Sequence, residues 1–394
     1  MANTISRRSL LKRSALLAGG LPFAASLWDQ AKADPRIIHS ALPPIAGETI
    51  LTDKDIALGA PMDLKARLFA NENPFGPSDK AKKAIMDALP TSYQYPFMFL
   101  KDLTQKIADH EGVKQENILM AAGSSPLLMA AAMYFSKAGS NVVSGYPTYE
   151  DLPSKAVRFH DQWVKVPLTA DYGLDLDAME KSIDGNTGLV YICNPNNPTG
   201  TVLDAQKLRS FCEKVSGRVP IFIDEAYIDY LDDPAGMTMI SGIKAGQNII
   251  VARTFSKVYG FAGLRVGYIV AQPDMIKKLS DYTVGSLSIS ATSLQGAIAT
   301  YQDSDYMQGV VKKTVASKNY LYEVLKKEGY SYVPSVANFV IFPIKMDGKQ
   351  FTDEMMKRGV GVRHWTINNK EYCRISIGRM DEMEAFAAAF KEIS

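Results

Sequence analysis

The stretch Gly188-Leu-Val-Tyr-Ile-Cys193 is an apolar run that leads straight into Asn194-Pro-Asn-Asn-Pro-Thr-Gly200, a segment of turn-forming residues. A run that is apolar on both faces is typical of a strand in a parallel sheet covered by helices. Similar runs occur at Asn141-Val-Val143, Val219-Pro-Ile-Phe-Ile223 and Asn248-Ile-Ile-Val-Ala252. Helical patterns alternate with them, at about 79–89, 99–111, 126–137 and 204–216. We therefore predict an α/β fold with a mostly parallel large sheet.

The pattern changes toward the C-terminus. Residues from about 273 to 327 are mostly helical in pattern, and after Gly329 two strand-like segments, 337–342 and 372–377, accompany amphipathic helices. We interpret residues 66–285 as a large domain. Residues 286–394 then form linking helices and a smaller α+β domain.

Polar side chains follow the apolar runs where each predicted strand ends. Asp224 and Tyr227 follow one run, Lys257 follows the next, and Gly123-Ser-Ser-Pro126 follows Leu119-Met-Ala-Ala122 at a helix start. Ligands of open parallel sheets bind beyond the carboxyl ends of the strands. An amine, a carboxylate, a phenol and a helix N-terminus at one rim meet the needs of pyridoxal phosphate. This cofactor requires a lysine imine, an acid at its ring nitrogen and donors for its phosphate.

Three segments, in this order and spacing, resemble the motifs of fold-type-I aminotransferases: Asn194–Gly200, Asp224–Tyr227 and Ser256–Gly267. Three others are similar to the histidinol-phosphate aminotransferase branch of class I and II: Asn71-Glu-Asn-Pro-Phe-Gly-Pro77, Tyr95-Pro96 and Arg374-Ile-Ser-Ile-Gly378. The resemblance extends from about residue 71 to the C-terminus. It implies the fold-type-I architecture with a seven-stranded large-domain sheet. It also implies pyridoxal 5′-phosphate as cofactor and amino-group transfer between an L-amino acid and a 2-oxo acid.

The same resemblance assigns roles around the cofactor ring. Lys257 would hold the cofactor as a Schiff base and, once released by substrate, move a proton at the substrate Cα. Asp224 would pair with the protonated pyridine nitrogen, and Asn197 and Tyr227 would hydrogen-bond the ring hydroxyl. Tyr149 would stack on the ring.

The cofactor phosphate would lie at a helix N-terminus. Ser124 and Ser125 would offer backbone N–H groups there, and Ser256 and Arg265 would complete the phosphate site. The branch usually has an acidic pair where this chain has Ser125-Pro126. Because proline has no N–H, that position cannot supply a further backbone donor.

A second subunit would contribute as well. The family forms homodimers, and by resemblance Tyr95 would reach the phosphate from the neighbouring subunit. Taken alone, Tyr95 could also be a surface tyrosine in a turn.

Two arginines would bind the substrate. Arg374 lies in an apolar strand pattern, where a buried guanidinium is costly unless it meets an anion, and the family role is to bind the substrate carboxylate. Arg363 matches the position that helps bind the phosphate of histidinol phosphate. Phe75 stands where many relatives have tyrosine, which removes one donor to a distal anion. We favour α-amino acids, aromatic ones among them, over a phosphorylated substrate.

Residues 1–33 have the pattern of an export signal, with a basic start, an apolar stretch over 15–28 and the small-residue pattern Ala31-Lys-Ala33. Ser6-Arg-Arg-Ser-Leu-Leu-Lys12 resembles the twin-arginine motif, with Leu10 where the commonest version has Phe. We predict passage through the twin-arginine translocase to the periplasm or another exported location, with an extended arm over 34–65. The apolar stretch is too short for a membrane-spanning helix of about 20 residues, so no stable span is expected.

The composition argues against several other classes. The 394 residues include 44 Lys+Arg and 42 Asp+Glu, a net charge of +2 that offers no basic face for nucleic acid. A hydrophobic content of 46% argues against disorder. Three cysteines and four scattered histidines predict neither a disulfide framework nor a metal site.

Three other functions stay open at this point. A racemase or lyase would use the same cofactor and the same first steps. An exported ligand-binding protein could retain the scaffold without catalysis, although Lys257, Asp224, Tyr227 and Arg265 together argue against it. A nicotinamide-dependent oxidoreductase is disfavoured because no G-x-G-x-x-G follows the first strand.

Overall fold

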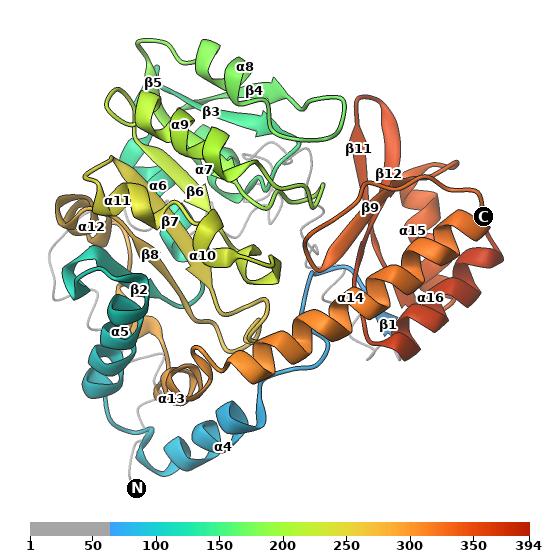
Figure 1. Cartoon of the computed structure of the whole chain (residues 1–394), viewed down its shortest axis with the longest axis horizontal. Helices are drawn as coiled ribbons and strands as arrows, with labels where there is room; N and C mark the ends of the chain where they lie inside the picture. Colours follow the sequence, from blue (N-terminus) through green and yellow to red (C-terminus); the bar gives the residue numbers. More distant parts are fainter. Residues whose placement is uncertain (1–63) are drawn as a thin grey trace, which may run out of the picture. The chain divides into compact units, whose positions relative to one another are not determined.

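The computed structural model describes residues 64–394, and its large sheet has seven strands in the order β2-β8-β7-β6-β5-β3-β4 (Figure 1). The strands are β2 (Ile118–Ala121), β3 (Asn141–Tyr146), β4 (Gln162–Pro167), β5 (Thr187–Cys193), β6 (Ile221–Asp224), β7 (Ile249–Thr254) and β8 (Gly267–Val270). β8 runs antiparallel to β2 and β7, and the other pairs of this sheet are parallel. The predicted α/β fold with a mostly parallel sheet is confirmed.

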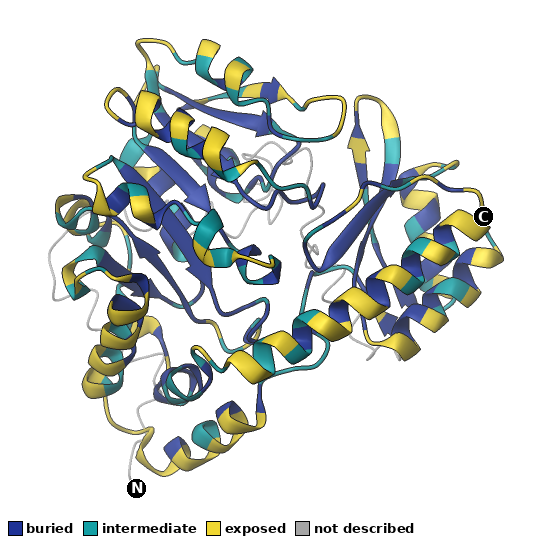
Figure 2. Ribbon diagram, in the orientation of Figure 1, coloured by how far each residue is buried: buried dark blue, intermediate teal, exposed yellow. Residues whose placement is uncertain are grey.

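Helices cover both faces of this sheet. In β5, Leu189, Tyr191 and Cys193 join one apolar cluster while Val190 and Ile192 join the other, because successive strand residues point to opposite faces. The first cluster is completed by α6 (Ser125–Phe135), α7 (Asp151–Arg158) and α12 (Pro273–Ser280). The second is completed by α5 (Phe97–Glu111), α8 (Leu176–Lys181), α9 (Ala205–Val215), α11 (Ile240–Lys244) and α13 (Ala291–Thr300). Figure 2 shows the central strands of the sheet buried and the outer sides of the helices exposed.

Shorter elements connect these layers. α4 (Asp79–Ala88) packs against α13 and is capped by Ser78, whose hydroxyl accepts from the Ala81 amide at 3.1 Å. The remaining elements of this part are η1 (Leu89–Thr91), η2 (Gln115–Asn117), η3 (Ile228–Tyr230), α10 (Pro234–Met237) and η4 (Ser286–Ser288).

A second, antiparallel sheet forms from the C-terminal part of the chain, in the order β11-β12-β9. Its strands are β9 (Phe339–Pro343), β11 (Arg363–Ile367) and β12 (Lys370–Ser376). The helices α14 (Ser304–Lys327), α15 (Gly348–Lys357) and α16 (Met380–Lys391) share an apolar core with it (Figure 1). β1 (Ala66–Arg67) pairs with β10 (Val360–Gly361) beside this core.

Of the described strands, the sequence pattern missed five: β1, β4, β8, β10 and β11. β4 and β11 lie at sheet edges and mix polar with apolar residues, so they lack the continuous apolar run of a central strand. β1 and β10 have only two residues each, and β8 has four. Segments this short are hard to separate from loops by periodicity.

The predicted export signal, 1–33, and all but the last two residues of the predicted arm, 34–65, lie outside the described residues. Over residues 64–394 the longest helices are too polar or too short to traverse a lipid bilayer.

Candidate active site

Four strands of the large sheet direct their carboxyl ends to the same edge. β5, β6 and β7 are mutually parallel, and β2 runs in their direction because β8 is antiparallel to both β2 and β7. Asn197 follows β5, Asp224 ends β6, Lys257 comes three residues after β7, and Ser124 comes three residues after β2. The topology therefore brings the predicted residues to one rim, where ligands of such sheets bind.

The amine of Lys257 is held beside the loop that contains Asn71. Its Nζ donates to the Asn71 carbonyl at 3.2 Å and lies 5.1 Å from the ring centroid of Tyr227. Burial, reinforced by the positive charges of Arg374 and Arg265, lowers the pKa of Lys257 to about 8, against the opposing effect of Asp224. Near neutral pH a useful fraction of this amine is therefore unprotonated, the form that attacks a carbonyl.

The carboxylate of Asp224 is buried and accepts two hydrogen bonds. The Ala226 amide donates to Oδ1 at 3.1 Å and the Tyr191 hydroxyl donates to Oδ2 at 3.3 Å. Burial raises the pKa of Asp224 to about 6, while these two bonds and the charge of Lys257 act in the opposite direction. The two hydrogen bonds orient the Asp224 carboxylate, so it is placed to accept a hydrogen bond from a cationic group beside it.

Asn71 links the two sheets and touches two predicted site residues. Its Nδ2 donates to the Tyr227 hydroxyl at 3.1 Å, and its carbonyl accepts from Lys257 and from Asn338 Nδ2 (3.1 Å). Ser376 Oγ accepts from the Asn71 amide at 2.7 Å. The sequence motif around Asn71 was visible, but its carbonyl contact with Lys257 was missed because it depends on the positive φ of Asn71, 53°.

The turn Gly123-Ser124-Ser125 joins β2 to α6 and packs against Arg265. Gly123 has a φ of +84°, and a Cβ there would lie 2.7 Å from the guanidinium carbon of Arg265. A Cβ on Gly267 would lie 2.6 Å from the Ser124 amide nitrogen. Both positions therefore require glycine. Arg265 also donates to Ser256 Oγ at 3.3 Å.

This turn presents the start of an 11-residue helix next to a guanidinium. The first amides of a helix lack intrahelical partners and carry partial positive charge, which favours an anion. Pro126 is the second residue of α6 and contributes no N–H. The predicted group of Ser124, Ser125, Ser256 and Arg265 is thus brought together.

The two predicted substrate arginines occupy directly opposite positions of the small sheet. Arg363 of β11 pairs with Arg374 of β12 in the antiparallel register, so both side chains leave the same face. Arg374 is buried and donates to Asn197 Oδ1 at 2.8 Å and to the Phe69 carbonyl at 2.7 Å. The Arg374 contact joins the small sheet to the loop after β5.

The remaining two predicted tyrosines differ in exposure. Tyr149 follows β3 by three residues and is half-buried against the cluster that contains Tyr191. Tyr95 is 76% exposed and lies in the turn before α5. Within this chain Tyr95 does not belong to the rim described above.

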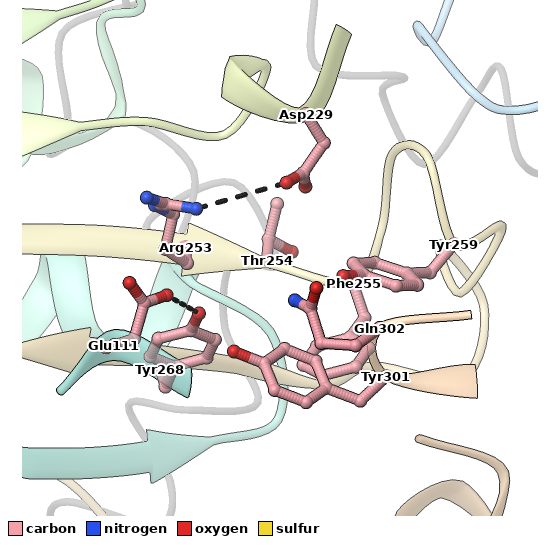
Figure 3. A pocket seen from close by; sticks show the side chains of 9 residues that line it. All are labelled: Glu111, Asp229, Arg253, Thr254, Phe255, Tyr259, Tyr268, Tyr301 and Gln302. Carbon is pink, nitrogen blue, oxygen red and sulfur yellow. Dashed lines mark hydrogen bonds and ion pairs between the residues drawn. The ribbon is translucent and has the colours of Figure 1, made fainter. Parts of the chain in front are cut away.

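A separate buried ionic cluster lies in the core near the same strands (Figure 3). Arg253 Nε is 2.8 Å from Glu225 Oε2, Arg253 Nη1 is 3.9 Å from Asp229 Oδ1, and the Tyr268 hydroxyl donates to Glu111 Oε1 at 2.9 Å. Arg253, Asp229, Glu111 and Tyr268 help to line a cavity of about 10 Å³, room for about one water. None of the predicted cofactor residues lines it, so the cluster is not the candidate site.

The chemistry of the rim fits pyridoxal phosphate. It offers an amine of lowered pKa, a buried carboxylate, a phenol and a glycine turn beside an arginine. Over residues 64–394 no group of three His, Cys, Asp or Glu side chains is arranged to hold a metal ion.

Comparison with known proteins identifies the group to which these features belong. The sequence pattern of the family "Aminotransferase class I and II" matches residues 65–390. The chain is 33% identical over 364 residues to histidinol-phosphate aminotransferase of Moorella thermoacetica, covering 90% of this chain and 94% of that protein. It is 31% identical over 350 residues to aromatic amino acid aminotransferase of Cutibacterium acnes, covering 86% and 98%.

A solved structure supports the same relationship. The crystal structure of histidinol-phosphate aminotransferase from Sinorhizobium meliloti in complex with pyridoxal-5′-phosphate is similar, with a TM-score of 0.78 and 29% identity. The match covers 84% of this chain and 90% of that one.

Proposed function

The chain belongs to the class I and II aminotransferases, which depend on pyridoxal phosphate, and we propose that it transfers an amino group between an L-α-amino acid and a 2-oxo acid. The observation that carries the proposal is the convergence of Lys257, Asp224 and the Gly123–Ser125 turn at one sheet edge. These three features supply a tether, a partner for the ring nitrogen and a phosphate site.

Each end of the cofactor has residues to hold it. The turn at the start of α6, with Ser256 and Arg265, would bind the phosphate. Asp224 would face the pyridine nitrogen, Asn197 and Tyr227 the ring hydroxyl, and Tyr149 the ring surface. When bound, pyridoxal phosphate supplies an aldehyde that reacts with amines and a ring that stabilises negative charge at the adjoining carbon.

Lys257 would act twice. Its amine would tether the cofactor and, when free, would hold or move the proton at the substrate Cα. A pKa of about 8 suits both tasks, because the amine can hold or release a proton near neutral pH. The Asn71 carbonyl, at 3.2 Å, orients this amine.

Arg374 would bind the substrate carboxylate. Its contacts with Asn197 and Phe69 fix the guanidinium beside the loop that faces the cofactor, so the carboxylate would be placed against the reacting carbon. Arg363 lies opposite it in the sheet and would face the distal end of a longer substrate.

The side-chain preference we propose is for aromatic L-amino acids. Similarity to aromatic amino acid aminotransferases supports it, and Phe75 offers a ring rather than a hydroxyl near the Asn71 loop. Histidinol phosphate is the second candidate, because Arg363 could meet its phosphate and the histidinol-phosphate aminotransferases are similar over the same length.

The visible absorbance of the purified, cofactor-loaded protein tests the reaction. We expect the absorbance of bound pyridoxal phosphate to convert to that of pyridoxamine phosphate on adding an aromatic L-amino acid without any oxo acid. Conversion by histidinol phosphate alone would reassign the substrate. A shift in absorbance without conversion would favour racemase or lyase chemistry, and a protein that takes up no cofactor would contradict the proposal.

We further propose a homodimer in which Tyr95 reaches the partner's phosphate site. Large apolar side chains are exposed around it: Tyr93, Tyr95, Phe97 and Met98 are 82%, 76%, 61% and 64% exposed. Sedimentation should give a dimer, and Tyr95→Phe should weaken pyridoxal phosphate binding without changing the dimer. A monomer that binds the cofactor normally would contradict this arrangement.

We also propose export through the twin-arginine route. The support is the Ser6–Lys12 motif and the signal-like pattern of residues 1–33. Replacing Arg7 and Arg8 together by lysine should retain the protein in the cytoplasmic fraction of its host. An unchanged distribution between cytoplasmic and exported fractions would contradict the proposal.

A further inference from the structure

Tyr191 lies in the middle of β5 and touches the carboxylate of Asp224. Its side chain is 1% exposed, and its hydroxyl donates to Asp224 Oδ2 at 3.3 Å. In the parallel register Tyr191 lies opposite Phe222, two residues before Asp224 on β6, so Tyr191 and Asp224 leave the same face of the sheet. This contact is not predictable from the sequence, because a tyrosine in an apolar strand is ordinarily a core residue.

Each oxygen of Asp224 therefore has a donor from the protein. The Ala226 amide serves Oδ1 and the Tyr191 hydroxyl serves Oδ2. The amide is part of the chain turn and is present whatever the side chain, whereas the hydroxyl is specific to tyrosine. A phenylalanine here would keep the ring packing against Phe222 and remove only this donor.

Other ionisable groups near Asp224 do not replace Tyr191. Cys193 on β5 stays a neutral thiol because burial raises its pKa well above the ordinary value, and it donates to the Pro195 carbonyl. Asp151 on α7 is paired with Lys155 at 2.8 Å. Lys257 adds a positive charge from the end of β7, but it is the group that would bind the cofactor.

We propose that Tyr191 is a positioning residue that holds the Asp224 carboxylate ionised and oriented for the pyridine nitrogen of pyridoxal phosphate. The inference rests on the proposed function and adds a residue to it. A donor to the charged form of a carboxylate favours that form. Burial opposes it, so a donor on this oxygen matters more here than at a solvated carboxylate.

The hydroxyl of Tyr191 can be removed alone, and the chain offers a matched control. Tyr191→Phe deletes the donor to Asp224, while Tyr268→Phe deletes a buried tyrosine donor to another carboxylate, Glu111, which lies by the cavity of Figure 3. Affinity of each cofactor-free protein would be measured for pyridoxal phosphate and for its carbocyclic analogue, in which C–H replaces the ring nitrogen. Circular dichroism and the thermal midpoint would establish that each variant is folded.

We expect Tyr191→Phe to weaken pyridoxal phosphate binding by about 3- to 10-fold, less than a full charge-assisted bond because 3.3 Å is long for a hydroxyl donor. Binding of the carbocyclic analogue should be unchanged by Tyr191→Phe, and Tyr268→Phe should leave both affinities at the wild-type value. In an Asp224→Asn background the effect of Tyr191→Phe should vanish, since the hydroxyl would then have no carboxylate to act through.

The outcomes separate this inference from the proposed function. If the wild-type protein binds no pyridoxal phosphate, both are overturned. If it binds the cofactor and Tyr191→Phe binds equally well, or loses the same affinity for both cofactor forms, only the inference is overturned. Equal loss for both forms would show that the hydroxyl supports the packing of β5 and not the charge of Asp224.

Discussion

Lys257 at the rim of the large sheet and Lys318 in α14 are both buried amines, and they differ in the charges around them. Burial lowers the pKa of each to about 8. Around Lys257 the charges of Arg374, Arg265, Asp224 and Glu72 also act, whereas no other charged group in the described part of the chain moves the pKa of Lys318. A lowered pKa therefore marks a desolvated amine. Charged groups around a desolvated amine, as at Lys257, are what indicate a functional site.

The partners of Lys318 show what a buried structural lysine does. Its Nζ donates to the carbonyls of Ser335 (2.7 Å) and Ala337 (3.1 Å), just before β9. The next residue, Asn338, donates to the Asn71 carbonyl that also accepts from Lys257. Lys318 thus fixes a loop near the site, while Lys257 faces the site itself.

The largest expected effect separates the two amines directly. Lys257→Ala should abolish transamination, a loss of at least about 10³-fold, because the tether and the proton carrier are removed together. Lys318→Met should retain most of the activity. Steady-state rates with an amino acid and an oxo acid measure both, and comparable activity in the two variants would remove the distinction between them.

A smaller effect is expected when the charge beside Lys257 is removed. Arg374→Ala should lower kcat/KM for carboxylate substrates, mostly by raising KM, because a buried charged partner of the substrate would be lost. The loss corresponds to about 2–5 kcal/mol of transition-state stabilisation.

The same variant should raise the pKa of Lys257, since the Arg374 charge is the second cause of its lowering. The pH midpoint of pyridoxal phosphate attachment should then move upward in Arg374→Ala. An unchanged carboxylate preference with an unchanged midpoint would place Arg374 outside the site.

The smallest expected effect concerns stability. A folded-state pKa of about 8 below an ordinary value of 10.5 means that the unfolded chain binds more protons between these values. The free energy of unfolding attributable to Lys318 should therefore rise from pH 8 to pH 10.5 and be lowest below pH 8.

Lys318→Met should remove this rise of the free energy of unfolding with pH. Below pH 8 the variant should be more stable than the wild type by about 1–2 kcal/mol, a gain already reduced by the loss of the two carbonyl contacts. Urea unfolding of both proteins across this pH range measures it. A parallel pH dependence in wild type and variant would show that Lys318 is charged and well solvated.

The sequence predicted the centre of the fold better than its edges. Thr187–Cys193 and Ile249–Thr254 are buried on both faces, so their apolar runs identify them as strands. Gln162–Pro167 alternates Val164 and Val166 with Lys165 at a sheet edge, and its pattern is no clearer than that of a loop.

The same division applies to the site. Asp224 ends β6 and Lys257 comes three residues after β7, so position along the chain located them at the rim. The contacts of Asn71 with Lys257 and of Tyr191 with Asp224 depend on a backbone angle and on the register between two strands. Neither is fixed by the residues next to them in sequence, and both had to be seen in the structure.

The antiparallel strand β8 also sets the order in which the proposed phosphate site can be completed during synthesis. In the large sheet β2 pairs with β8 alone, and its turn at Gly123 packs against Gly267 of that strand. A ribosome working at about 5–20 residues per second delivers β8 roughly 7–30 s after β2. The nascent chain therefore spends that interval with an unpaired β2 and an unfinished turn at Gly123, so we expect cofactor capture at the proposed phosphate site to follow the emergence of residue 270.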